Sequence, residues 1–225
     1  MNKKEYCYKY PRPSVTTDCV IFGYDGNDLF VLLIKRANEP FKDQWAFPGG
    51  FLEMDEKAID GAKRELKEET GVDNVEIEQF HTFSEPGRDP RGRTLSIVYY
   101  ALVQKDEIVH QAGDDAGETR WFSMKNLPQL AFDHDYVFNK ALSRLRADSK
   151  YRPIGRYALP GNFRLHQLKK LYEVVLGTAI DEQKLLYLLR ENNVVIVQEQ
   201  VETDPLLKFD GEYYLQKKET GFNFV

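Results

Sequence analysis

Apolar runs near the N-terminus predict a β-hairpin. The segments 14–24 and 29–36 are rich in β-branched and aromatic residues, and they flank the turn-forming sequence Asp-Gly-Asn-Asp at 25–28. Further patterns predict strands near 75–84 and 94–104, a short strand at 119–123 and a helix near 134–147. This irregular alternation of strands and helices indicates an α/β fold with a mixed sheet between helices.

Glycine and proline residues punctuate the chain after residue 150 and predict a domain boundary there. Beyond it, apolar residues at helical spacing predict one helix with Leu165, Leu168, Leu171, Tyr172 and Val175, and another at about 182–192. The runs 194–197 and 213–216 predict two strands around a loop. Helices followed by a two-stranded wing are typical of a winged helix, so we expect domains at 1–150 and 151–225.

The chemistry of the chain concentrates in the 23 residues between Gly50 and Val72. They follow the spacing G-x5-E-x7-R-E-U-x-E-E-x-G-U, where U is a bulky aliphatic residue. Chance would produce it on the order of 10⁻¹⁰ times per start position at average residue usage. The specified positions are Gly50, Glu56, Arg64, Glu65, Leu66, Glu68, Glu69, Gly71 and Val72.

Three acids of this segment share one face of a predicted helix. At 100° per residue, Glu65, Glu68 and Glu69 fall within an arc about 100° wide. Carboxylates at such short separations repel one another unless a cation lies among them. Mg²⁺ and Mn²⁺ prefer oxygen ligands of this kind and also accept phosphate oxygens. The pattern therefore predicts metal-assisted phosphate chemistry. A solvated acidic face is the alternative.

The rest of the same helix carries structural signals. Ile59, Ala62 and Leu66 predict an apolar stripe against the core, and Gly71 is a suitable helix stop. Gly61 lies among the acids, and we interpret it as clearance for substrate, with simple tolerance of a glycine as the alternative.

The nine positions resemble the Nudix box, and on them the chain is identified as a member of the Nudix family. The resemblance implies an α/β/α sandwich and a metal site involving Gly50, Glu56, Glu65, Glu68 and Glu69. It also implies that Glu56 orients the helix or binds an outer metal water, and that Arg64 holds a box carboxylate.

An arginine-rich loop follows the box. Arg88, Arg91 and Arg93 lie within six residues, and arginine forks suit phosphate and ribose oxygens, although a solvated turn is the alternative. Pro86 lies 86 − 71 = 15 residues after Gly71. The segment is similar to that of ADP-ribose pyrophosphatases of the Nudix family, which have a proline at about this distance.

A second group of acids precedes Trp121. The resemblance places an extra acid on a mobile loop here, and Glu118 or Asp115 is our candidate to bind another metal or accept the proton of the attacking water. Solvated loop acids are the alternative. The four histidines have no metal-ligand spacing, so we expect structural roles for them.

Composition restricts the cellular setting. The chain has 225 residues and a net charge of −5, with 21 Lys+Arg against 26 Asp+Glu in residues 1–150 and 10 against 10 in residues 151–225. Neither half is a basic nucleic-acid binder by charge alone. Cys7 and Cys19 have no CxxC spacing and no run is membrane-spanning, so we expect a reduced cytoplasmic protein without membrane association.

Two functions compete. A Nudix domain with a winged helix resembles Nudix-related transcriptional regulators, which commonly have a degraded box and a basic second helix. Here the box is intact, and residues 181–191 carry two positive and three negative charges, so DNA binding is disfavoured.

We therefore expect a Mg²⁺- or Mn²⁺-dependent hydrolase that cleaves a nucleoside diphosphate derivative, with ADP-ribose giving AMP and ribose 5-phosphate as the best candidate. The alternative is a DNA-binding regulator that senses ADP-ribose or a sugar-type ligand, and a degenerate scaffold comes third. We also expect a homodimer, and a winged helix that uses Leu165, Leu168 and Tyr172 to pack on its own Nudix domain or on a second subunit.

Overall fold

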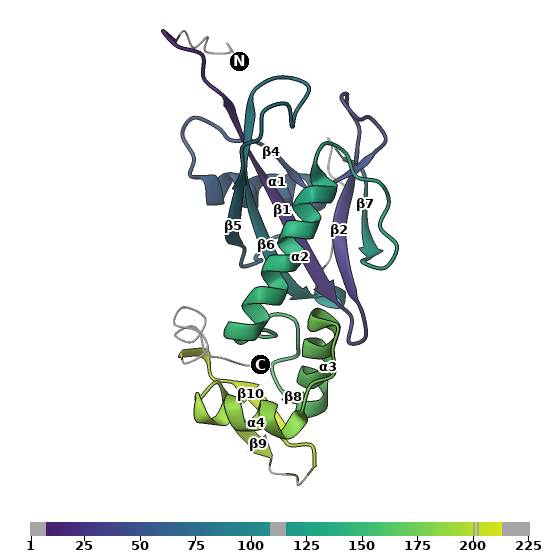
Figure 1. Cartoon of the computed structure of the whole chain (residues 1–225), viewed down its shortest axis with the longest axis vertical. Coiled ribbons are helices and arrows are strands. Elements are labelled where there is room, and N and C mark those ends of the chain that lie inside the picture. The colour runs from purple at the N-terminus through teal and green to yellow at the C-terminus, as the bar shows by residue number, and fades with distance from the viewer. Residues whose placement is uncertain (1–7, 109–115, 200, 202, 213–225) are drawn as a thin grey trace.

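A seven-stranded mixed sheet forms the centre of the N-terminal part of the protein in a computed structural model that describes residues 8–108, 116–199, 201 and 203–212 (Figure 1). Strand β1 (Ser14–Tyr24) pairs antiparallel with β2 (Leu29–Arg36) and parallel with β6 (Thr94–Gln104). The shorter strands extend this framework: β3 (Trp45–Ala46) and β7 (Ala116–Ser123) pair with β2, β4 (Gly49–Phe51) with β1, and β5 (Glu78–Phe83) with β6.

One long helix covers each face of the sheet. Helix α1 (Ala58–Thr70) places Ala62 and Leu66 in a core cluster with Cys19, while α2 (His134–Tyr151) belongs to the cluster that contains Val20. Successive residues of β1 thus enter opposite cores, as the two-residue period of a strand requires. The predicted α/β/α sandwich with a mixed sheet is confirmed.

Local signals set the ends of the first elements. The Asp25 carboxylate accepts the N–H groups of Asn27 and Asp28 at 2.9 Å each, which fixes the β1–β2 turn. Helix α1 ends at Gly71, which has a φ of 71° and donates its N–H to Lys67 O at 2.8 Å. The predicted apolar stripe is wrong at Ile59, which is 37% exposed and lies outside that core cluster, whereas its neighbour Ala58 packs against it.

The C-terminal part is a winged helix. It consists of β8 (Phe163–Arg164), α3 (Leu165–Leu176), α4 (Glu182–Glu191), β9 (Val195–Glu199) and β10 (Leu206–Phe209). The strands form a separate antiparallel sheet in the order β8-β10-β9. The strand that pairs with β9 is therefore 206–209, and the predicted strand 213–216 lies outside the described residues. A short 3₁₀ turn, η1 (Lys105–Glu107), follows β6.

The winged helix packs on the N-terminal sandwich, as predicted. Leu165, Leu168 and Tyr172 are buried in the same core cluster as Val20, and the Tyr172 hydroxyl accepts the N–H of Ile154 at 3.0 Å. Helix α2 ends one residue past the predicted domain boundary at 150/151. The boundary itself stays a prediction.

Among the described residues, none of the helices has the length and apolar character that crossing a membrane requires.

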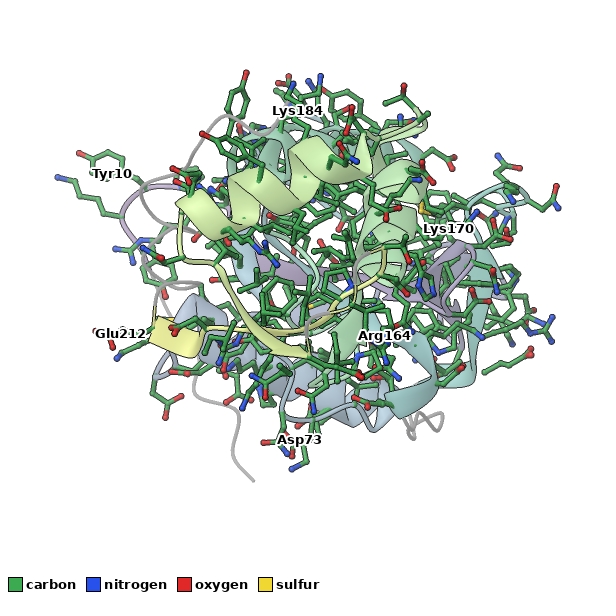
Figure 2. All side chains as sticks on the ribbon, turned by 90° about the horizontal axis from the view of Figure 1, so that it is seen from below. Tyr10, Asp73, Arg164, Lys170, Lys184 and Glu212 are labelled. Carbon is green, nitrogen blue, oxygen red and sulfur yellow. The ribbon has the colours of Figure 1, made fainter. Side chains whose placement is uncertain are left out.

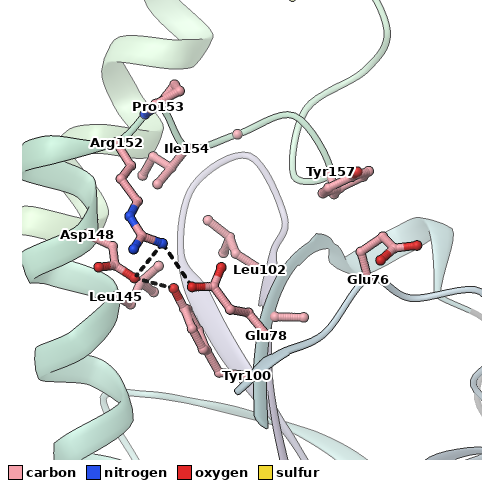
Figure 3. Close-up of a pocket in the computed structure, with 12 residues that line it drawn as sticks. Glu76, Glu78, Tyr100, Leu102, Leu145, Asp148, Arg152, Pro153, Ile154 and Tyr157 are labelled. Atoms are coloured by element: carbon pink, nitrogen blue, oxygen red, sulfur yellow. Dashed lines mark hydrogen bonds and ion pairs between the residues drawn. The ribbon is translucent and has the colours of Figure 1, made fainter. Parts of the chain in front are cut away.

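A cavity of about 540 Å³ lies between β6, the end of α2 and the segment that leads to the winged helix (Figure 3). Arg152 donates to Glu78 at 2.8 Å, the Nε–H of Arg144 is shared between the two carboxylate oxygens of Asp148 at 2.8 and 2.9 Å, and the Tyr100 hydroxyl also donates to Asp148. Each of these arginines has a carboxylate partner, so the network closes on itself and joins α2 to the sheet.

Candidate active site

Arg64 organises the acids of the box. Its guanidinium forms ion pairs with Glu56 at 2.7 Å, Glu65 at 2.8 Å and Glu68 at 3.0 Å. It also donates to the carbonyl of Phe51 at 3.2 Å. The bond with Arg64 holds the pKa of Glu56 below its ordinary value and raises the pKa of Arg64 itself. A single cation thus collects three of the predicted site acids.

Two glycines bring the remaining carboxylates to the backbone. Gly49 donates its N–H to Glu69 Oε2 at 2.8 Å. A Cβ atom on Gly50 would overlap the carboxylate of Glu65, so a larger residue there would displace that carboxylate from its present position. Asp18 pairs with Gly49 in the β1–β4 register, and a Cβ on Gly49 would lie 2.6 Å from its Oδ1. Glu65, Glu69 and Asp18 therefore converge on this glycine pair.

The convergence raises the proton affinity of the acids. Burial, together with the charges of Glu65 and Asp18, raises the pKa of Glu69 from 4.5 to about 8, against the opposing bond from Gly49. Burial also raises the pKa of Glu65. Carboxylates that are disfavoured in their charged form would gain from a nearby cation.

The donor set fits a hard divalent cation. Among the residues that the structure describes, no three acids, histidines or cysteines are already placed to hold one ion together. In this arrangement Arg64 occupies oxygens of Glu65 and Glu68, and Gly49 occupies one of Glu69. The oxygen ligands and the raised pKa values nevertheless suit Mg²⁺ or Mn²⁺.

Gly61 does not provide clearance for substrate, so that interpretation is wrong. It is buried in α1, and a Cβ atom there would lie 2.8 Å from both Glu56 Oε1 and Leu52 Cδ1. The missing side chain therefore lets the segment before α1 pack on the helix and deliver Glu56 to Arg64. Helical periodicity places Gly61 near the acids but does not show what fills the space.

A cleft of about 550 Å³ begins at the glycine pair. Its wall combines cations with aromatic rings, and the side chains that matter most are Arg36, Arg88, Arg91, Phe51 and Phe132. Asp18 and His134 line it as well. Cations and aromatic faces together suit a ligand that contains phosphates and a nucleobase.

The arginine-rich loop contributes two of its three arginines to this cleft. Arg88 forms a bidentate contact with Asp133 at 2.8 and 2.9 Å, and its side chain is only 6% exposed. Arg91 pairs with Asp89 at 2.7 Å and is 40% exposed. Arg93 instead donates to the carbonyl of Ser84 at 2.7 Å, and the structure places neither it nor the exposed Pro86 in the cleft wall.

Glu118 is not part of the cleft wall. It is in β7, where its side chain pairs with Arg120. The neighbouring Thr119 donates its hydroxyl to Glu69 O at 3.2 Å, which ties β7 to the end of α1. Asp115 lies outside the described residues, so the predicted loop acid stays a prediction.

Several residues of the cleft have no signal in the sequence. His134 is 5% exposed and its Nδ1 accepts the N–H of Phe47 at 3.0 Å, a contact that suits the structural role expected for this histidine. Burial lowers the pKa of His134 and keeps the ring neutral. Phe132 has a φ of 54°, a left-handed conformation that costs of the order of 1–3 kcal/mol for a non-glycine residue. Only the fold brings Arg36 and Asp18 to the same wall.

The comparisons with known proteins agree with this geometry. The NUDIX domain model matches residues 12–141, which is more than half of the chain. The chain therefore belongs to the Nudix family, and its complete box is that of a Nudix pyrophosphohydrolase.

Two curated relatives represent the two functions considered above. The chain is 34% identical over 190 residues to the ADPR responsive transcriptional repressor NtrR of Acinetobacter baylyi, covering 83% of this chain and 76% of the relative. It is 44% identical over 128 residues to the ADP-ribose pyrophosphatase of Methanocaldococcus jannaschii, covering 57% of this chain and 72% of the relative.

Solved structures extend the likeness to the C-terminal part. A MutT/nudix family protein from Enterococcus faecalis superposes with a TM-score of 0.78 at 30% identity, covering 92% of this chain and 90% of that one. Shewanella oneidensis NrtR complexed with a 27mer DNA has a TM-score of 0.74 at 28% identity, covering 89% and 95%. The likeness thus spans the sandwich and the winged helix.

Proposed function

We propose that this protein hydrolyses the pyrophosphate bond of a nucleoside diphosphate derivative, ADP-ribose being the best candidate, with AMP and ribose 5-phosphate as products. The observation that carries the proposal is the shared position of Gly49 and Gly50. They contact Glu69 and Glu65 of the intact box, and they also line the cleft that contains the arginines. The acids and the ligand cleft therefore meet at one point.

The residues of the chain divide the work. Glu65, Glu68 and Glu69 would hold Mg²⁺ or Mn²⁺, with Gly50 and Glu56 beside them, and the bound ion supplies charge to the pyrophosphate and lowers the pKa of the attacking water. Arg64 fixes the directions of the box acids. Arg88 and Arg91 face the cleft, where their guanidinium groups would bind phosphate or ribose oxygens. Glu118 or Asp115 remains our candidate for the proton acceptor.

An assay of the purified full-length chain tests this proposal. With Mg²⁺ present, ADP-ribose, other nucleotide sugars, ATP and dinucleotides are compared by kcat/KM, and AMP release is measured by chromatography. We expect ADP-ribose to exceed ATP, because the cleft offers contacts to both ends of a disubstituted pyrophosphate. Faster hydrolysis of free nucleoside triphosphates would contradict it. Light scattering during the same preparation tests the predicted homodimer.

A second candidate is a ligand-responsive regulator that binds DNA. It is favoured by the likeness to NtrR over 83% of this chain and by the winged helix itself. The charges of α4 disfavour DNA binding. Lys184 and Arg190 are its cations, Glu182 and Glu191 are its acids, and the acidic Asp181 caps it.

Nor do three cations of the described winged helix form one patch. Seen from the winged-helix end, Lys184, Lys170 and Arg164 lie apart from one another (Figure 2). Arg164 pairs with Glu199 at 2.9 Å, and this ion pair leaves it fewer N–H donors and less positive charge for a phosphate. Phosphate contacts supply most non-specific DNA affinity, so we expect weak binding at physiological salt.

Fluorescence anisotropy against the promoter of the neighbouring genes separates the two candidates. We expect no sequence-dependent binding at physiological salt and a shallow dependence on salt, because each neutralised phosphate adds a log–log slope of about −0.9. Nanomolar, sequence-dependent binding that ADP-ribose relieves would establish a regulator, whether or not the protein also hydrolyses its ligand.

A further inference from the structure

The start of α3 and the wing, which is the turn from β9 to β10, meet in a cluster of paired charges. Arg164 and His166 supply the basic side chains, and Glu199 and Asp204 supply the acids; we call these four residues the wing clasp. Arg164 Nη2 lies 2.9 Å from Glu199 Oε2, and His166 Nδ1 lies 2.7 Å from Asp204 Oδ2. The Arg164 guanidinium also donates to the carbonyl of Asp204 at 3.1 Å. Both basic side chains thus face acids of their own chain.

The backbone of α3 holds Asp204 in this place as well. Its Oδ1 accepts the N–H of His166 at 3.0 Å, and the neighbouring Pro205 carbonyl accepts the N–H of Leu165 at 3.2 Å, so two free N–H groups of the first turn are satisfied. Burial alone would raise the pKa of Asp204, but the bonds from His166 and the charge of Arg164 hold this pKa below its ordinary value. The carboxylate therefore stays ionised at neutral pH.

The same pairing continues along α3. Lys169, one turn after His166, forms an ion pair with Glu182 of α4 at 3.3 Å. Two other cations of the described winged helix, Lys170 and Lys184, lie apart from Arg164 in the view from the winged-helix end (Figure 2). Where β8 and α3 present basic side chains at neighbouring positions, acids of the wing and of α4 thus compensate them.

These pairs affect an external anion more than they affect the fold. Glu199 and His166 are 54% and 62% exposed, and exposed ion pairs contribute little to stability. A phosphate that approaches the same basic groups, however, must displace the carboxylates and come close to their negative charges. The pairing therefore costs a polyanion both the contacts and the attraction that Arg164 could supply.

We propose that the acids of the wing clasp, Glu199 and Asp204, keep the winged helix from binding the phosphate backbone of nucleic acids. The contact is autoinhibitory, because the acids occupy N–H groups of Arg164 and His166 that would otherwise reach phosphate oxygens. It is independent of the proposed hydrolysis, since none of the four residues lines the cleft beside the box. The weak DNA binding expected above would then originate in the wing as well as in α4.

Fluorescence anisotropy of the full chain with a duplex DNA of unrelated sequence tests the autoinhibitory contact. Glu199→Gln and Asp204→Asn each remove a charge but keep a side-chain oxygen, so the cap on α3 can still form. At about 50 mM salt, each single variant should bind about threefold and the double variant about tenfold more tightly than the wild type, and the log–log salt slope should steepen by about 0.9 for each phosphate newly contacted. Glu191→Gln is the matched control for the single variants, because Glu191 is an exposed acid at the end of α4 that forms none of these pairs.

A third substitution shows whether Arg164 is the cation that the acids cover. Arg164→Gln added to the double variant should remove most of the gain in affinity. Circular dichroism checks that each variant is folded, and Glu199→Gln, which leaves the cap on α3 untouched, decides the question if Asp204→Asn unfolds. Unchanged affinity of the folded variants, a gain no larger than that of Glu191→Gln, or a gain that survives Arg164→Gln would each overturn the autoinhibitory contact.

The same variants keep the two proposals distinguishable. The kcat/KM for ADP-ribose should change by less than about twofold in each of them, because the wing clasp is not part of the cleft. Absence of hydrolysis in the wild type would contradict the proposed activity, while the comparison of DNA affinities would still decide the role of the clasp. Tight DNA binding by the wild type that these substitutions fail to strengthen would contradict the autoinhibitory contact alone.

Discussion

Two cavities of similar size, about 550 Å³ and 540 Å³, are lined by arginines and carboxylates but differ in how those charges are compensated. In the cavity beside the winged helix, Arg152 pairs with Glu78 and the Tyr100 hydroxyl donates to Asp148 (Figure 3). Asp148 also pairs with Arg144. In the cleft beside the box, Arg36 has no acidic partner within the described residues, while Glu69 has a raised pKa.

The difference supports the cleft beside the box as the proposed ligand site. A closed network has already used its hydrogen-bonding capacity within the protein, so it stabilises the arrangement of α2 on the sheet. An open set of charges is less stable alone, and it gains when a cation meets the acids and an anion meets the arginines. Cavity volume alone would not distinguish the two.

The largest expected effect concerns the acids of the open site. Glu69→Gln keeps the shape of the side chain but removes a charge that would hold the metal, so hydrolysis of ADP-ribose should fall by about two or more orders of magnitude. The melting temperature should stay close to that of the wild type. Turnover near the wild-type rate in steady-state assays would remove Glu69 from the metal site.

The next effect separates two arginines of the same cleft. Arg91→Ala should raise the KM for ADP-ribose about tenfold with a smaller change in kcat, because Arg91 is partly exposed and lies at the cleft wall. Arg88→Ala should also raise the KM, but it additionally leaves Asp133 without its partner and should destabilise the fold by about 3 kcal/mol. Kinetics combined with urea unfolding measures both, and equal stability of the two variants would contradict this distinction.

The closed network predicts a stability effect without a kinetic one. Arg152→Leu breaks the pair with Glu78 and should lower the free energy of unfolding by about 1–2 kcal/mol while leaving the KM unchanged. Lys150→Leu is the control, because Lys150 is exposed near the end of the same helix. An altered KM in Arg152→Leu would show that the cavity beside the winged helix communicates with the cleft.

The smallest effect is a pH dependence of the metal-free protein. The pKa of Glu69 in the fold is about 8 against an ordinary value of 4.5, so the folded state holds a proton that the unfolded chain releases. The contribution of protonated Glu69 to the free energy of unfolding is therefore greatest below pH 4.5, and it is lost as pH rises through about 8. In thermal unfolding with EDTA, the melting temperature of the wild type should fall a few degrees more than that of Glu69→Gln between about pH 5 and pH 8.5. Parallel curves for the two proteins would contradict the raised pKa.

The sequence predicts those features that depend on short-range patterns. The hairpin of β1 and β2, the helices α3 and α4, and the box with its acids on one helical face all follow from periodicity and turn residues within about 25 positions. Where the pattern weakens, the prediction loses precision. Ile59 fits the apolar stripe by angle, yet it is exposed, and Ala58 packs against the core cluster instead.

The site combines features that the sequence predicts with contacts that only the tertiary structure forms. From the sequence alone follow the identity of the box, the expectation of Mg²⁺ or Mn²⁺ and the class of reaction, because nine residues at fixed spacing specify them. Only the tertiary structure places Arg36 beside Arg91 and Phe132, and brings the Phe47 N–H to His134, which is 87 positions away. Such contacts depend on the packing of whole elements across the sheet, and no local pattern of residues encodes which arginine will pair with a carboxylate and which will not.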